Sequence, residues 1–303
     1  MIVVAEDGVR LQVAGYGEGW RHLLLIPDWL SSSTFFEGLI EPLVHRGARV
    51  ALYDPRGTGH SDRPLAGYSV VREAEDAALV LEALTMRPAW VVGHGYGAHV
   101  ALKLARIHPE LVAGILLLMP TYSLGANRVT PWRDAVEDVR RLADVIASSS
   151  VGPLAPDRLT IQARDMAKTT RAAGLARLDV LAAPLDLPAL TVPAKVLAAE
   201  LDDWTPLGTA RRALADWARI FHVWPGAGHY GVLEDPDHAV DLMLETLDQE
   251  PAPESPETAE TAGGDDGAAG DRSLGDEEKA SGPDEIIRSP WGPPLRQTLP
   301  KSR

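Results

Sequence analysis

One stretch of seven residues, VVGHGYG at 91–97, constrains the fold more than any other part of the chain. Apolar residues lead into it, glycine stands at every second position from 93 to 97, and a segment of helical character, 96–108, follows. Glycine adopts backbone conformations that other residues resist, and it lets neighbouring backbones approach closely. The stretch therefore predicts a buried strand, a sharp turn and a helix in immediate succession.

Apolar runs alternate with amphipathic segments through most of the chain. Continuous runs rich in Val, Leu and Ile are typical of strands buried on both faces of a mostly parallel sheet. We predict strands at 9–14, 22–26, 49–53, 89–93, 113–119, 194–199 and 219–223. We predict helices at 32–46, 69–85, 96–108, 207–217 and 236–249. This alternation indicates an α/β fold with a doubly wound, mostly parallel sheet.

Two parts of the chain depart from the alternation. Residues 122–187 are helical in pattern, at 132–148 and 156–177, and we expect them to form a cap inserted into a single domain spanning 1–249. Residues 250–303 are acidic and rich in Pro, Gly and Ala, with too few large apolar side chains to offset the entropy of ordering, so we predict a disordered tail. Within it, 284–296 holds two Ile, a Trp and a Leu. That segment either packs on the domain or is a linear motif that docks on a protein partner.

Composition argues against several classes of function. The net charge of −14 disfavours a nucleic-acid partner, since phosphate binding needs clustered Lys and Arg. The chain has no cysteine, which excludes disulfides and thiolate chemistry. No His, Asp or Glu cluster has the sequence spacing of metal ligands, so we predict no metal and no other cofactor. No apolar run reaches the roughly 18 residues of a membrane span, so we expect a cytoplasmic protein with no membrane partner.

Four segments, in this order, resemble the α/β-hydrolase superfamily. Residues 23–29, LLLIPDW, are similar to the strand and loop that supply an oxyanion-hole amide, and 53–64, YDPRGTGHSDRP, to the D-x-R-G-x-G-x-S turn. Residues 91–97 are similar to the nucleophile elbow, G-x-S-x-G. Two later segments, 200–206 (ELDDWTP) and 225–230 (PGAGHY), are similar to the loops that carry the acid and the histidine of the catalytic triad. The resemblance spans about residues 9–247 and implies an α/β-hydrolase fold.

The resemblance also assigns roles to single residues. It implies that His229 is the general base and that Asp202 orients it, with the adjacent Asp203 as the less favoured alternative. It places the backbone amides of Trp29 and Tyr96 at the oxyanion hole.

The sequence departs from the family pattern at two positions. Gly95 stands where the family has its serine, which excludes a covalent acyl-enzyme at that position. Pro27-Asp28 replaces the usual His-Gly. An inward-facing Asp28 carboxylate would oppose the charge that an oxyanion hole stabilises, whereas an outward-facing one would be only a loop residue. Ser61 corresponds to a turn residue and His94 to a structural residue, so neither is expected to replace the nucleophile.

The candidate pocket is aromatic and predicts a small organic ligand; it comprises Asp28, Trp29, Tyr96, Trp132, Trp204 and Tyr230. One interpretation is an enzyme without an acyl-enzyme, in which His229 and Asp202 activate water or transfer a proton. The other is an inactive pseudo-hydrolase that binds a ligand or a protein, with the tail as a docking segment. The retained His–Asp pair slightly favours the enzyme. A third interpretation is that the glycine at 95 is an introduced, inactivating replacement of serine in an ordinary hydrolase. The altered residues 27–28 argue against it.

Overall fold

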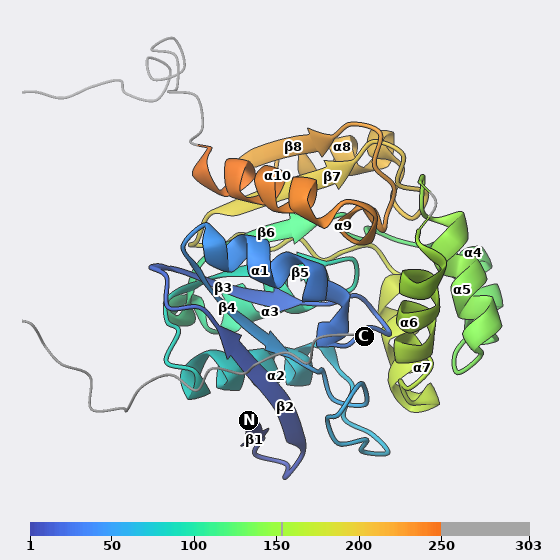
Figure 1. The fold of residues 1–303 in the computed structure, drawn as a ribbon, viewed down its shortest axis with the longest axis horizontal. Coiled ribbons are helices and arrows are strands. Elements are labelled where there is room, and N and C mark those ends of the chain that lie inside the picture. Colours follow the sequence, from blue (N-terminus) through green and yellow to red (C-terminus); the bar gives the residue numbers. More distant parts are fainter. Residues whose placement is uncertain (153, 250–303) are drawn as a thin grey trace, which may run out of the picture. The chain divides into compact units, whose positions relative to one another are not determined.

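The computed structural model describes residues 1–152 and 154–249, and only the backbone of residues 126 and 127. Its centre is a sheet of eight strands in the order β1-β2-β4-β3-β5-β6-β7-β8 (Figure 1). β1 and β2 are antiparallel to their neighbours, and the strands from β4 to β8 run parallel. The strands are β1 (Ile2–Val4), β2 (Arg10–Tyr16), β3 (Arg21–Ile26), β4 (Ala48–Tyr53), β5 (Ala89–His94), β6 (Val112–Leu118), β7 (Ala194–Ala199) and β8 (Ile220–Trp224).

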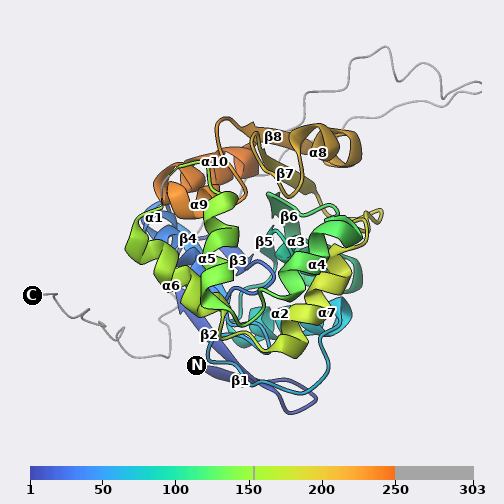
Figure 2. The ribbon, with the colours of Figure 1, turned by 90° about the vertical axis from the view of Figure 1, so that its right-hand side faces the viewer.

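Helices cover both faces of the sheet, as the predicted doubly wound fold requires. α1 packs with α10 on one face, and α2 packs with α3 on the other (Figures 1 and 2). The central strands are apolar because both of their faces are covered, and every residue of β7 is buried. These helices are α1 (Glu37–His45), α2 (Val70–Ala83), α3 (Gly97–Ile107), α8 (Leu207–Leu214), α9 (Gly231–Glu234) and α10 (Pro236–Asp248).

Four further helices lie between β6 and β7 in the sequence and gather at one end of the sheet (Figure 1). They are α4 (Gly125–Arg133), α5 (Val139–Ser148), α6 (Pro156–Met166) and α7 (Arg171–Leu181). They occupy the segment for which the sequence predicts an inserted cap. The parallel strands β3 to β8 point their carboxyl ends toward this side, which is where open α/β sheets bind ligands (Figure 1).

The boundaries of several predicted elements were wrong for local reasons. The helix predicted at 132–148 is interrupted because Glu137 has a left-handed backbone, with φ of 74°, and Asp138 then caps α5. The helix predicted at 156–177 divides because the Thr170 side chain accepts a hydrogen bond from the Ala173 amide and starts α7. The short elements β1 and α9 were not predicted. The tail 250–303, with its motif at 284–296, lies outside the described residues.

No helix in the described part of the chain is long and apolar enough to cross a lipid bilayer.

The elbow depends on direct backbone contact between β3, β5 and the start of α3. A Cβ atom at Gly97 would lie 2.2 Å from the carbonyl oxygen of Ile26. A Cβ atom at Gly93 would lie 2.3 Å from the carbonyl oxygen of Gly97. Both clashes involve backbone, which cannot rotate away, so these glycines fix how closely the helix approaches the sheet.

Gly97→Ala should therefore lower the free energy of unfolding by about 2 kcal/mol or more, because the sheet and helix must separate. Gly208→Ala is the matched control. Its Cβ would meet only the side-chain Nη1 of Arg212, at 3.5 Å, and alanine favours a helix over glycine. Urea unfolding of both variants measures the difference. Equal changes in unfolding free energy in the two variants would show that the close backbone contact at Gly97 does not limit stability.

Candidate active site

The candidate residues come from four loops at one edge of the sheet. Asp28 follows β3, Gly95 follows β5, Asp202 follows β7 and His229 follows β8. Because parallel strands end at the same edge, residues up to 201 positions apart in the sequence can meet there. All four residues are buried.

His229 and Asp202 form the pair that the resemblance implies. Nδ1 of His229 lies 3.0 Å from Oδ2 of Asp202. Oδ1 of Asp202 accepts hydrogen bonds from the backbone amides of Trp204 and Thr205, at 2.8 and 3.2 Å, which fix the carboxylate. The neighbouring Asp203 turns away and pairs with the partly exposed Arg128 at 3.5 Å.

Asp28 faces inward, which settles the orientation that the sequence left open. Its Oδ1 accepts a hydrogen bond from the backbone amide of Tyr96 at 2.8 Å. Its Oδ2 lies 3.4 Å from Nε2 of His229. A Cβ atom at Gly95 would lie only 2.2 Å from Oδ1 of Asp28 and 3.1 Å from Oδ2. The carboxylate thus occupies the place of a residue-95 side chain and takes one of the two amides that the resemblance assigns to the oxyanion hole.

The charges of Asp28 and His229 stabilise each other. Burial opposes ionisation of Asp28, but His229, which faces it at 3.4 Å, holds the pKa of Asp28 below the usual value. Burial likewise opposes a charged His229, yet Asp202 and Asp28 together raise its pKa to about 9. For His94, burial and the neighbouring charge of His229 outweigh the carboxylates and lower its pKa to about 4. Near neutral pH the site therefore contains an imidazolium between two carboxylates, next to a neutral imidazole.

The predicted aromatic residues do gather around this centre, but they pack against one another. Trp204 stacks on the His229 ring, with centroids 3.9 Å apart and planes 10° apart. Trp132, from α4, contacts Trp204 at 4.2 Å and Trp29 at 5.6 Å between centroids. Tyr230 lies edge-on to His229. The enclosure is aromatic as predicted, with Trp132 the half-buried member among rings that are otherwise buried.

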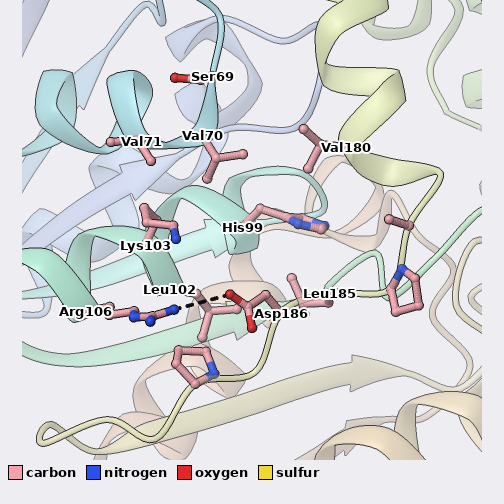
Figure 3. Close-up of a pocket in the computed structure, with 13 residues that line it drawn as sticks. Ser69, Val70, Val71, His99, Leu102, Lys103, Arg106, Val180, Leu185 and Asp186 are labelled. Carbon is pink, nitrogen blue, oxygen red and sulfur yellow. Dashed lines mark ion pairs between the residues drawn. The ribbon is translucent and has the colours of Figure 1, made fainter.

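A cavity of about 330 Å³ lies elsewhere, between α2, α3 and the segment after α7 (Figure 3). His99 and Leu102 of α3 line it, and an ion pair joins Arg106 to Asp186 at 3.5 Å across it. None of the four loop residues of the candidate site lines this cavity. It is close to the elbow only through His99, whose ring stacks on Tyr96 at 5.9 Å.

Comparison with known proteins identifies the fold. The model of the alpha/beta hydrolase fold matches residues 21–161. A protein named putative carbamate hydrolase RutD, from Caulobacter segnis, is 35% identical over 115 residues, which are 37% of this chain and 43% of that protein. A 2-hydroxymuconate semialdehyde hydrolase from Pseudomonas putida is 31% identical over 150 residues, which are 48% of this chain and 53% of that protein. The chain has the alpha/beta hydrolase fold.

The fold extends further than these sequence matches, which span about half of the relatives or less. The solved structure of an esterase from Exiguobacterium antarcticum superimposes with a TM-score of 0.75 at 19% identity, over 82% of this chain and 99% of that one. In this chain a serine at position 95 and the inward Asp28 exclude each other, because their atoms would overlap. The two departures seen in the sequence are therefore a single structural change.

Gly95→Ser tests this exclusion. We expect the single variant to lose about 2 kcal/mol or more of unfolding free energy, because the serine displaces the buried carboxylate. When Asp28→Gly is added, Gly95→Ser should lower the unfolding free energy by less. The difference is a coupling energy of about 1–3 kcal/mol between positions 28 and 95. Urea unfolding of the native chain, both single variants and the double variant measures the coupling. If the losses of unfolding free energy in the two single variants simply add in the double variant, the overlap between a serine at 95 and the Asp28 carboxylate is contradicted.

Sequence reasoning missed Arg177, which joins the inserted helices to the site. From α7 its Nε donates to Glu73 at 2.9 Å, and its Nη1 donates to the carbonyl oxygen of Trp29 at 3.0 Å. Its Nη2 reaches the carbonyl oxygen of Arg56 at 2.9 Å. An arginine within an amphipathic helix gives no sign in the sequence of a buried contact 148 residues away. Arg177 thus holds the loop that carries Asp28.

Arg177→Met should lower the unfolding free energy by about 3–5 kcal/mol, because it leaves the Glu73 carboxylate buried without its partner. Adding Glu73→Gln removes that charge and should recover part of the loss. Thermal and urea unfolding of both variants provide the comparison. A double variant no more stable than Arg177→Met would show that the lost packing and backbone hydrogen bonds, rather than the stranded charge, set the cost.

Proposed function

We propose that this protein is an atypical enzyme that acts on a small organic carbonyl compound without forming a covalent acyl-enzyme. The observation that carries the proposal is the facing pair of Asp28 Oδ2 and His229 Nε2. They lie 3.4 Å apart at the place of the family nucleophile. Both atoms are buried and have no hydrogen-bond partner among the described residues. Because buried polar atoms in native proteins nearly always have partners, a water molecule or a polar group of a substrate would complete this pair.

The charge states assign the two roles. Since two carboxylates keep His229 protonated, we assign the proton acceptor to Asp28 and the proton donor to His229, with Asp202 holding the ring. A water molecule would lose a proton to Asp28 as its oxygen adds to the carbonyl carbon. The leaving group would take a proton from Nε2 of His229 as its bond to carbon breaks. Transfer of the proton from Asp28 to His229 would then restore both groups.

The enclosure and the relatives favour a compact, largely apolar substrate. Three indole rings and Tyr230 surround the pair. The named activities of the sequence relatives, carbamate hydrolase and semialdehyde hydrolase, both concern small carbonyl compounds. We therefore place small esters and carbamates first among candidate substrates, in a cytoplasmic setting. The same pair would also suit proton transfer to and from an acidic carbon.

One observation favours the inactive alternative. Trp204 covers the face of His229 and Trp132 packs on Trp204, so the pair is closed off in this conformation. A pseudo-hydrolase would need no access to the centre. It would use the domain, or the segment 284–296, to bind a ligand or a protein partner.

Asp28→Asn and His229→Gln should each reduce kcat by about 10²–10⁴-fold, because each removes one partner of general acid–base catalysis. Asp203→Asn is the matched control and should stay within about twofold of the native rate, since that carboxylate turns toward Arg128. Initial rates on a panel of small aryl esters and carbamates measure the effect. A native chain with no turnover on the panel, or turnover unaffected by Asp28→Asn, would favour the inactive alternative or another centre.

A further inference from the structure

Three side chains that are distant in the sequence converge at the elbow: Asp28, His94 and His229. Each offers one nitrogen or oxygen atom, and these atoms lie within 4.8 Å of one another. Asp28 Oδ2 and His229 Nε2 are 3.4 Å apart. Two ligand atoms that are each about 2.1 Å from an ion, at a tetrahedral angle, are separated by about this distance. All three residues are buried.

In each of the three side chains, one polar atom is hydrogen-bonded and the other has no hydrogen-bond partner among the described residues. Asp28 Oδ2, His94 Nδ1 and His229 Nε2 have no hydrogen-bond partner among the described residues. The other polar atom of each is fixed. Tyr96 N–H donates to Asp28 Oδ1, His94 Nε2 donates to the carbonyl oxygen of His229 at 2.9 Å, and His229 Nδ1 bonds to Asp202.

This division of partners is typical of metal ligands. A ligating histidine donates its second ring N–H to a carboxylate or a backbone carbonyl, which fixes the ring and leaves the other nitrogen for the metal. His229 has the carboxylate partner and His94 has the carbonyl partner. A donated Nε2–H on His94 leaves its Nδ1 with a free lone pair. The hydrogen bonds thus prepare both rings as ligands.

The charges of the centre suit a dication. Asp28 and Asp202 are both buried and both face His229. Two buried carboxylates on either side of one ring are unfavourable without a compensating positive charge. A dication bound to neutral imidazoles balances both carboxylates.

We propose that Asp28, His94 and His229 form a binding site for a divalent transition-metal ion, such as Zn²⁺ or Fe²⁺. Two histidines and one carboxylate are a donor set that such ions use. The inference goes beyond the proposed function, because with an ion bound Oδ2 of Asp28 and Nε2 of His229 would be ligands instead of the proton acceptor and donor. An ion there would polarise a carbonyl or activate water at the place of the family serine. Asp202 and the Tyr96 amide act as positioning groups for the ligands.

Metal content and cobalt spectroscopy test the site without relying on turnover. The full chain, produced in medium supplemented with Zn²⁺ and passed through gel filtration, should retain about one metal ion per chain by elemental analysis. Co²⁺ added to the metal-free chain should give visible absorption bands from nitrogen and oxygen coordination. His94→Gln and Asp28→Asn should each weaken binding by about 100-fold or more, since each removes a direct ligand, whereas loss of an outer partner costs 10–100-fold.

His99→Gln is the matched control. His99 is also buried, and its Nε2 also bonds to a backbone carbonyl oxygen, that of Thr121 at 3.1 Å, but it lies outside the cluster. This variant should retain its metal. Circular dichroism checks that each variant is folded, and His94→Gln tests the site even if Asp28→Asn does not fold.

The outcomes separate this inference from the proposed function. A folded native chain that binds no Zn²⁺ or Co²⁺, or equal binding by the native chain and His94→Gln, overturns the metal site. Turnover that persists in chelator and still depends on Asp28 would overturn it as well, while leaving the acid–base proposal intact. One bound ion that is lost in His94→Gln, with no turnover of any substrate, would support the site and contradict the proposed function.

Discussion

The active-site region is organised by one buried interaction, the hydrogen bond from the Tyr96 amide to the Asp28 carboxylate. It holds a negative charge at the point where the superfamily places a serine side chain and an oxyanion. Together with Asp202, that charge raises the pKa of His229, which in turn stabilises the ionised Asp28. The glycine at 95, the protonated histidine and the filled oxyanion amide all follow from where this single carboxylate lies.

Buried charges of this kind persist only where the surrounding structure holds them. The loop after β3 carries Asp28 and is fastened by Arg177, which bonds to the carbonyl oxygen of Trp29, the next residue. Arg177 is itself balanced by Glu73. The inserted helices therefore contribute to the site twice, through Trp132 in the aromatic enclosure and through Arg177 behind the loop. Ion pairs buried in this way add little to stability, but losing one partner is costly, so they define a single arrangement.

The sequence predicted the strand–helix alternation because apolar periodicity and glycine spacing are local properties. It also predicted that His229 and Asp202 belong together, since both stand in motifs with a fixed order. It did not predict the direction of Asp28, because a loop side chain turns according to what lies opposite it, and Gly95 leaves that space 67 residues away. The cluster with His94 was missed for the same reason: its members are separated by 66 and 135 positions, far from any local metal-ligand spacing.

The overlap between Asp28 and a serine at 95 also bears on how the elbow lost its nucleophile. An isolated Ser-to-Gly change in an ordinary hydrolase would leave an empty position beside the histidine and an open oxyanion hole. Here the position is filled by a carboxylate that bonds the oxyanion amide and faces the histidine. A carboxylate in that place is incompatible with the serine, so the loop after β3 and the elbow fit each other only as a pair. At this elbow a fixed negative charge therefore lies where a serine side chain would otherwise be.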